Sequence, residues 1–178
     1  MTSSAAPARA AAGDQIEQAV RGPIVTRSEL EAQQARVWDH VTTVRGINDE
    51  LRPWLRMTAT RDLRANGIAA VRVGERLCRS WVLLLGVLPI DYDDITLERL
   101  DPPRGFLERS TMLSQRAWEH ERTLEPAPHG GSGCVITDRI SYEPRVAVPD
   151  AILRAMYAAI FRHRHRRLRR RFGGRALD

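Results

Sequence analysis

The chain has no lysine, few cysteines and no long apolar run. All 28 basic residues among its 178 are arginine. The two cysteines, Cys78 and Cys134, fit neither a disulfide framework nor a metal-ligand spacing, so we expect both to be reduced and buried. The longest apolar run, residues 81–90, is interrupted by Gly86 and Pro89 and falls short of the roughly 18 residues that a transmembrane helix needs. These absences argue against a disulfide scaffold, a cysteine metal centre and a membrane span.

The N-terminal residues have no apolar segment of the kind that a secretory signal contains. Their small and polar composition predicts a disordered leader over residues 1–22. The remaining length suits one domain, which we expect over residues 23–173, followed by a tail over residues 174–178. Without a signal or a span, the expected location is cytoplasmic.

Positive charge is concentrated near the C-terminus. The net charge is +6, but residues 162–175 contain eight arginines and no acid, so the rest of the chain is close to neutral. Such a cluster favours contact with an anionic membrane surface or with nucleic acid. The arginines can also stabilise the C-terminal end of a helix, because cations interact favourably with the helix dipole. They are not interleaved with aromatic residues, as they would be in a protein that binds single-stranded nucleic acid. Membrane contact is therefore the better of these two candidates.

Turn residues divide most of the chain into short elements. Residues 23–32 read as a first strand, residues 35–56 as a helical pair broken near Gly46, and residues 57–77 are ambiguous. A meander follows, with strands expected over 76–87, 91–100, 104–113, 116–125 and 132–143. Pro149 and Gly173 then bound one long helix, over residues 149–172.

This order of elements is that of an α+β helix-grip fold, in which a curved antiparallel sheet wraps around a long C-terminal helix. One face of the sheet must be covered, and the last helix is the only predicted element long enough to cover it.

Two segments carry a family resemblance. Residues 106–124, "FLERSTMLSQRAWEHERTL", resemble a strand–turn–strand pattern of bacterial members of the SRPBCC (START/Bet v1-like, polyketide cyclase/dehydrase-like) superfamily. Residues 131–144, "GSGCVITDRISYEP", resemble the next strand of that family. The matching positions are Phe106, Glu108, Ser110, Trp118, His120, Arg122, Leu124, Thr137, Asp138, Ile140 and Tyr142. The chain departs from the pattern in having Glu108 for aspartate, Arg122 for a second histidine, and "LSQ" for a Gly-Pro turn. The resemblance implies binding of a lipid, polyketide or aromatic molecule, or a cyclase or aromatase activity.

A hairpin at 104–125 with a three-residue loop at 113–115 would place polar residues on one face. Ser110 would then lie opposite Trp118, Glu108 opposite His120, and Phe106 opposite Arg122. We expect a cavity between the sheet and the last helix, with an apolar wall and a few polar groups. The expected apolar lining is Trp54, Met57, Trp81, Leu83, Phe106, Trp118, Ile140, Met156 and Ile160. The expected polar groups are Glu108, Ser110, His120, Arg122, Asp138, Tyr142 and His163.

Three roles remain open for the polar groups. They can satisfy one another inside the fold, orient a ligand, or perform acid–base chemistry with His120 and Glu108 as the candidates. On the last helix, His163 shares a stripe with Met156 and Ile160, and His165 is expected on the opposite side. No metal spacing, phosphate-binding loop or nucleophile motif is present, so we expect no metal and no cofactor, in a monomer or homodimer.

Overall fold

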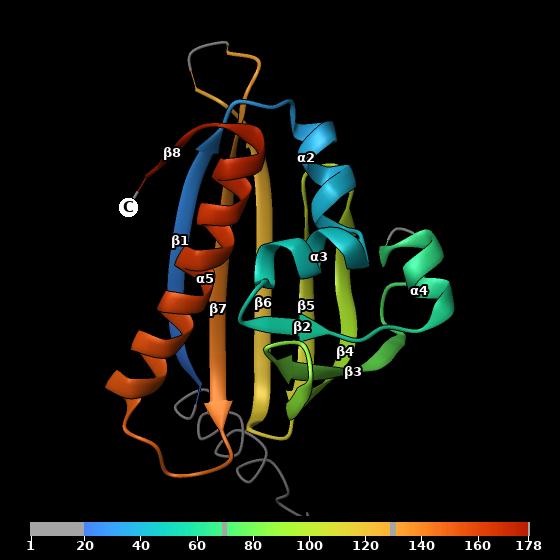
Figure 1. The fold of residues 1–178 in the computed structure, drawn as a ribbon, viewed down its shortest axis with the longest axis vertical. Helices are drawn as coiled ribbons and strands as arrows, with labels where there is room; N and C mark the ends of the chain where they lie inside the picture. The colour runs from blue at the N-terminus through green and yellow to red at the C-terminus, as the bar shows by residue number, and fades with distance from the viewer. Residues whose placement is uncertain (1–19, 69–70, 129–130, 178) are drawn as a thin grey trace, which may run out of the picture.

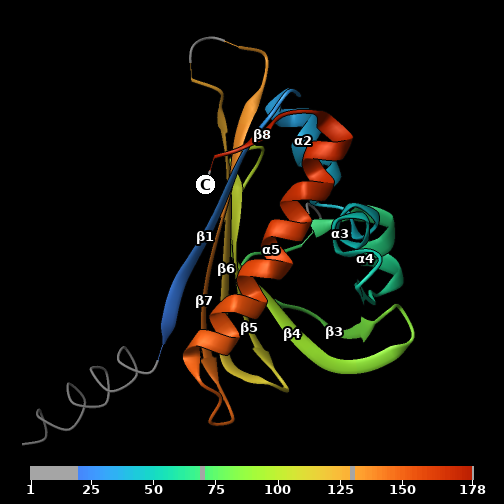
Figure 2. The ribbon, with the colours of Figure 1, turned by 60° about the vertical axis from the view of Figure 1, so that its left-hand side comes forward.

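The computed structural model describes residues 20–68, 71–128 and 131–177, and the expected leader lies almost wholly outside them. In these segments an eight-stranded sheet carries its helices on one side (Figures 1 and 2). The elements in chain order are β1 (Arg21–Leu30), α2 (Gln34–Val41), α3 (Val44–Leu51), β2 (Leu55–Met57), α4 (Arg61–Asn66), β3 (Arg76–Leu84), β4 (Leu88–Asp101), β5 (Gly105–Met112), β6 (Gln115–Pro126), β7 (Cys134–Pro144), α5 (Asp150–Phe172) and β8 (Arg175–Ala176). The strands of the meander and the last helix were predicted with small differences at their ends.

The sheet has the order β2-β3-β4-β5-β6-β7-β1-β8, and all of its neighbouring strands are antiparallel. Register shifts interrupt the pairing of β3 with β4 and of β4 with β5. Because such irregularities bend a strand and increase its twist, they help the sheet to curve. Figure 2 shows β3 and β4 curving round toward α3, while α5 crosses the concave face. The predicted helix-grip architecture is confirmed.

The β5–β6 hairpin has the predicted register. Ser110 lies opposite Trp118, Glu108 opposite His120, and Phe106 opposite Arg122. Buried and less buried residues alternate along β6 from Trp118 to Leu124, which is the pattern of a strand with one face turned to the core. On the other side of β6, strand β7 brings its own polar and aromatic side chains to this inner face.

The break between the first two helices does not fall at Gly46, as the sequence suggested. It falls at Thr42 and Thr43, and the Thr43 side chain accepts a hydrogen bond from Gly46 N, which caps α3. Gly46 lies inside α3, where a Cβ would meet the backbone oxygen of His40 at 1.8 Å, so the position requires glycine. The glycine therefore allows α2 and α3 to approach each other.

The last helix begins after Pro149 and ends at Gly173, whose φ of 75° lies in the left-handed region that favours glycine. Beyond it, β8 pairs with Ser28 and Glu29 of β1, inside the stretch expected to be a tail. No helix in the described segments combines the length and the apolar character that crossing a bilayer requires.

Candidate functional site

A large cavity lies between the concave face of the sheet and α5. Its volume is about 810 Å³, within the range typical of small-molecule sites. Most of its wall is apolar, with Ile95, Leu97, Phe106, Trp118, Tyr157 and Phe161 among the buried residues that line it. These residues come from two separate clusters of buried hydrophobic residues, so the cavity lies between two parts of the core.

Exposed apolar side chains also belong to the cavity wall. Trp54 is 58% exposed, Ile90 47% and Met156 44%, and all three line the cavity. Large apolar side chains that are both exposed and part of a cavity wall mark the place where the cavity meets the surface. An apolar molecule would therefore meet an apolar rim on entering.

Nine of the residues proposed from sequence line this cavity. They are Trp54, Met57, Phe106, Glu108, Trp118, His120, Met156, Ile160 and His163. Seven others lie elsewhere, namely Trp81, Leu83, Ser110, Arg122, Asp138, Ile140 and Tyr142. Of these, Ser110, Arg122, Asp138, Ile140 and Tyr142 are buried in the adjoining core.

Trp81 was assigned to the wrong face of its strand. It is 46% exposed and packs edge-on against Tyr92, while Val82 and Leu84 line the cavity. Leu83 likewise does not line the cavity. Because side chains alternate along a strand, an error of one residue in phase moves each of them to the opposite face.

His120 joins the cavity wall to a buried polar network. Its Nε2 lies 2.9 Å from Asp138 Oδ1, and its Nδ1 lies 4.0 Å from Glu108 Oε2. The imidazole packs edge-on against Phe106 and Phe161, with ring centres 5.4 and 5.2 Å apart. The ring is thus held by a carboxylate on one side while the residue faces the cavity.

Arg122 is the centre of that network. Its guanidinium donates to both oxygens of Asp138, at 2.7 Å each, and to both oxygens of Glu50, at 3.0 and 2.9 Å. Arg164 donates to Glu50 as well, at 2.9 Å. Burial alone would raise the pKa of Asp138 and of Glu50, but the neighbouring arginines outweigh it and hold both pKa values below their ordinary range.

His165 belongs to the same network, contrary to its expected position on the outer side of the helix. It is fully buried, with Nε2 3.0 Å from Asp138 Oδ2 and Nδ1 2.9 Å from Ser28 Oγ. Arg169 donates to the same Ser28 oxygen at 2.7 Å. Because the Asp138 carboxylate can only accept, Nε2 is the donor to it, and the Ser28 hydroxyl, which accepts from Arg169, can donate its own proton to Nδ1.

The face that α5 turns inward also differs from the expected stripe. Its buried residues are Leu153, Tyr157, Phe161, Arg164, His165 and Leu168. The expected stripe of Met156, Ile160 and His163 lies beside this face, at the edge of the cavity. The i, i+4 spacing of Leu153, Tyr157 and Phe161 was a usable signal. Nothing in the sequence pointed to Glu50 as the partner of Arg122.

Asp93 is a further cavity residue that the sequence did not single out. Its side chain is buried, and Oδ1 has no hydrogen-bond partner among the described residues. Burial and the nearby charge of Glu108 raise the pKa of Asp93 well above its ordinary value, while a hydrogen bond with Ser110 acts in the opposite direction. Within the described chain, no group of three or more His, Cys, Asp or Glu residues is placed to hold a metal ion.

Replacing Asp93 by asparagine is expected to stabilise the protein at neutral pH. A carboxyl whose pKa is raised on folding binds its proton more tightly in the folded state, so stability falls as the pH rises above about 4, the value for an unfolded aspartate. The Asp93→Asn variant should lack this loss. Urea midpoints measured between pH 4 and pH 7 test the prediction.

Asp94 provides the matched control on the outer face. Hydrogen bonds from Arg79 and Arg76 outweigh the effect of desolvation and lower the pKa of Asp94 to about 2. Asp94→Asn should therefore destabilise slightly above pH 4, the opposite sign. Equal responses of the two variants would contradict the assignment.

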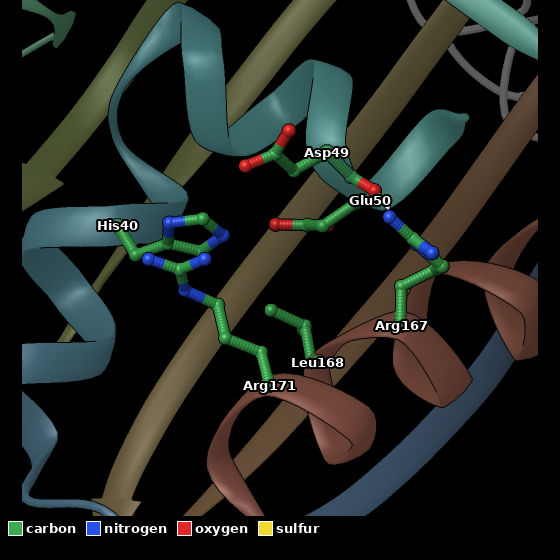
Figure 3. Close-up of a pocket in the computed structure, with 6 residues that line it drawn as sticks. All are labelled: His40, Asp49, Glu50, Arg167, Leu168 and Arg171. Carbon is green, nitrogen blue, oxygen red and sulfur yellow. Dashed lines mark hydrogen bonds between the residues drawn. The ribbon is translucent and has the colours of Figure 1, made fainter. Parts of the chain in front are cut away.

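A second, smaller pocket lies between α2, α3 and α5 (Figure 3). Its volume is about 150 Å³, and Figure 3 shows the guanidinium of Arg171 beside the imidazole of His40. Burial and the charge of Arg171 lower the pKa of His40. Arg167 donates from Nε to the backbone oxygen of Asp49 at 3.0 Å. The pocket is polar and too small for a molecule that the large cavity would accommodate.

Solved structures with the same architecture cover most of the chain. A protein from Chromobacterium violaceum has a TM-score of 0.64 at 16% identity, over 86% of this chain and 99% of its own. A START superfamily protein from Mycobacterium smegmatis has a TM-score of 0.60 at 11% identity, over 85% and 97%. Ara h 8.0201 has a TM-score of 0.54 at 11% identity, over 84% and 97%. At these identities the likeness establishes the fold, which is of the START/Bet v1-like type.

No curated protein sequence matches the chain. One family model does match, over residues 28–172, which run from the end of β1 to the end of α5 and include the cavity and the buried network. The chain therefore belongs to the family described as a domain of unknown function, DUF8410.

Proposed function

We propose that the protein binds a small hydrophobic molecule in the cavity between the sheet and α5. The observation that carries the proposal is the cavity itself, about 810 Å³ with a mostly apolar wall. Protein interiors are close-packed and contain few voids larger than a water molecule. A cavity of this volume suits an occupant whose apolar surface leaves water on binding, which contributes about 25 cal/mol for each Å².

A titration with N-phenyl-1-naphthylamine, an uncharged fluorescent probe, tests this proposal. We expect saturable binding with one site per chain, because the cavity between the sheet and α5 has a volume suited to the probe. A fluorescence response that rises without saturation, or no response at all, would contradict it.

A second candidate function is acid–base chemistry on the bound molecule. One observation favours it. His120 faces the cavity with Nε2 held by Asp138, and Glu108 lies 4.0 Å from the other ring nitrogen. A histidine oriented by a carboxylate can accept or donate a proton through its second nitrogen. This candidate requires a cyclisation or dehydration activity, with His120 as the proton-transfer group.

The variant His120→Ala separates the two candidates. Because Asp138 loses one of its donors, we expect the free energy of unfolding to fall by about 1–3 kcal/mol, with the probe affinity of the folded protein little changed. An enzyme would show a different result, in which turnover of a polyketide-like substrate is lost while its affinity persists. Glu108→Gln keeps the shape of the side chain and removes its charge, so a bell-shaped pH–rate profile altered in this variant would favour catalysis.

Contact of the C-terminal arginines with an anionic surface stays a prediction. Four of the eight arginines already have partners inside the fold. Arg164, Arg167, Arg169 and Arg175 hydrogen-bond to Glu50, Asp49, Ser28 and Glu29 respectively. Fewer of these charges are thus available to an external partner than the sequence suggested.

A further inference from the structure

Two buried oxygen atoms on the wall of the large cavity have no hydrogen-bond partner in the described part of the chain. They are Oδ1 of Asp93 and Oε1 of Gln115, in residues that are 4% and 2% exposed. Both residues line the cavity. Buried polar groups are nearly always hydrogen-bonded, and leaving one unsatisfied costs about 1–3 kcal/mol. Each of these atoms therefore indicates the chemistry of what binds beside it.

Oδ1 of Asp93, unpartnered among the described residues, lies beside a second carboxyl group, that of Glu108. Ser110 lies next to both residues, and its hydroxyl donates to Glu108 Oε1 at 3.1 Å. Burial and the charge of Glu108 disfavour the ionised form of Asp93. A donor placed at Oδ1 would be accepted by the ionised carboxylate and would offset that cost, whereas a second anion would add to it.

The hydrogen bonds around Gln115 identify Oε1 as an acceptor. The Ser114 hydroxyl donates to Asp91, so its oxygen can only accept from Gln115. The group that faces Ser114, at 3.3 Å, is therefore the amide nitrogen Nε2. Oε1 is left as a second acceptor.

Both acceptors lie around the tip of the β5–β6 hairpin. Asp93 pairs with Met112 at the end of β5, and Gln115 begins β6 three residues after Met112. Asp91 accepts from the backbone of Leu113 and Ser114 in the loop between them. By contrast, the arginines that line the cavity, Arg164 and Arg166, lie on the second half of α5. This end of the cavity therefore presents acceptors and carboxyl groups.

We propose that the occupant of the cavity is amphipathic, with an apolar body and a hydroxyl or protonated amine head that donates hydrogen bonds to Asp93 and Gln115. This inference rests on the proposed function and specifies its ligand class. A carboxylate head is selected against, because it has no proton to donate and would lie close to Asp91 and Glu108. Like charges and unsatisfied acceptors both oppose its binding.

Three ligands with the same ten-carbon chain test the inference, namely 1-decanol, decylamine and decanoate. Each displaces N-phenyl-1-naphthylamine from the full-length protein at pH 7.5. We expect the alcohol and the amine to bind at least about tenfold more tightly than decanoate. If decylamine binds more tightly than 1-decanol, the charge of the head contributes to the affinity. If the two bind equally, hydrogen bonding alone accounts for the preference. Both outcomes support a donor head.

Substitutions at Asp93 assign the preference to its side chain. Asp93→Leu removes the acceptor, and the ratio of alcohol to decanoate affinity should fall by about tenfold. Asp93→Asn retains a carbonyl oxygen and should retain the preference. Asp94→Asn, on the outer face, should leave the ratio unchanged. These ratios are measured on folded protein, so a change in stability does not imitate the effect.

Decanoate binding as tightly as decanol, or a preference that survives Asp93→Leu, would overturn the inference while leaving hydrophobic binding intact. Failure of the probe and of all three ligands to bind would overturn the proposed function itself, and the ligand class with it.

Discussion

Replacing Arg122 by methionine is expected to lower the free energy of unfolding by about 3–5 kcal/mol, the cost of removing one partner from a buried ion pair. Arg122 is fully buried and donates to both carboxylates, Glu50 and Asp138, which are themselves 1% and 0% exposed. Without the guanidinium these charges lose the donor that lies between them. Urea denaturation at pH 7 measures the loss.

Arg109→Met is the matched control for this prediction. Arg109 lies on the adjacent strand and pairs with Glu119 at 2.9 Å, but its side chain is 59% exposed. Exposed pairs contribute about 0–1 kcal/mol, so this variant should be close to wild type. Equal losses for Arg122→Met and Arg109→Met would show that the buried network does not carry the stability we assign to it.

Partial blocking of the cavity is the second change with a large expected effect. Ile95 lies on the sheet wall and Ile160 on α5, and both line the cavity. The double variant Ile95→Trp/Ile160→Trp places two indoles into the space between them. We expect the affinity for N-phenyl-1-naphthylamine to fall at least about tenfold, equivalent to about 1.4 kcal/mol.

A control for added bulk uses positions that do not line the cavity. Thr96 is the neighbour of Ile95 on the other face of β4, and Ile152 is 59% exposed on α5. Thr96→Trp/Ile152→Trp should bind the probe as wild type does. Loss of binding in this variant, or unchanged binding in the blocked one, would place the probe site outside the cavity.

Local pattern predicted most of the sheet. Alternation along β6, the short "LSQ" loop and the strand before it were enough to place Glu108 opposite His120 in the correct register. Turn residues predicted the strand ends of the meander, and Pro149 and Gly173 bounded the last helix. These features depend on neighbouring residues, which a sequence shows directly.

The parts that could not be predicted depend on contacts between distant segments. Glu50 meets Arg122 across 72 positions of sequence, and His165 meets Asp138 across 27. Neither contact leaves a local signal. The inward face of α5 is set by how the helix lies on the curved sheet, so an apolar stripe alone placed His165 on the wrong side. Likewise, Asp93 acquires its character from burial beside Glu108 and Ser110.

Native mass spectrometry of the full-length protein, purified without detergent, tests the binding of a hydrophobic molecule most directly. The account predicts a second species that is heavier than the bare chain by the mass of one small molecule. This molecule should be recovered by organic extraction, and the species should be depleted in Ile95→Trp/Ile160→Trp. A spectrum that contains only the bare chain, and that is unchanged after incubation with 1-decanol or N-phenyl-1-naphthylamine, would contradict it.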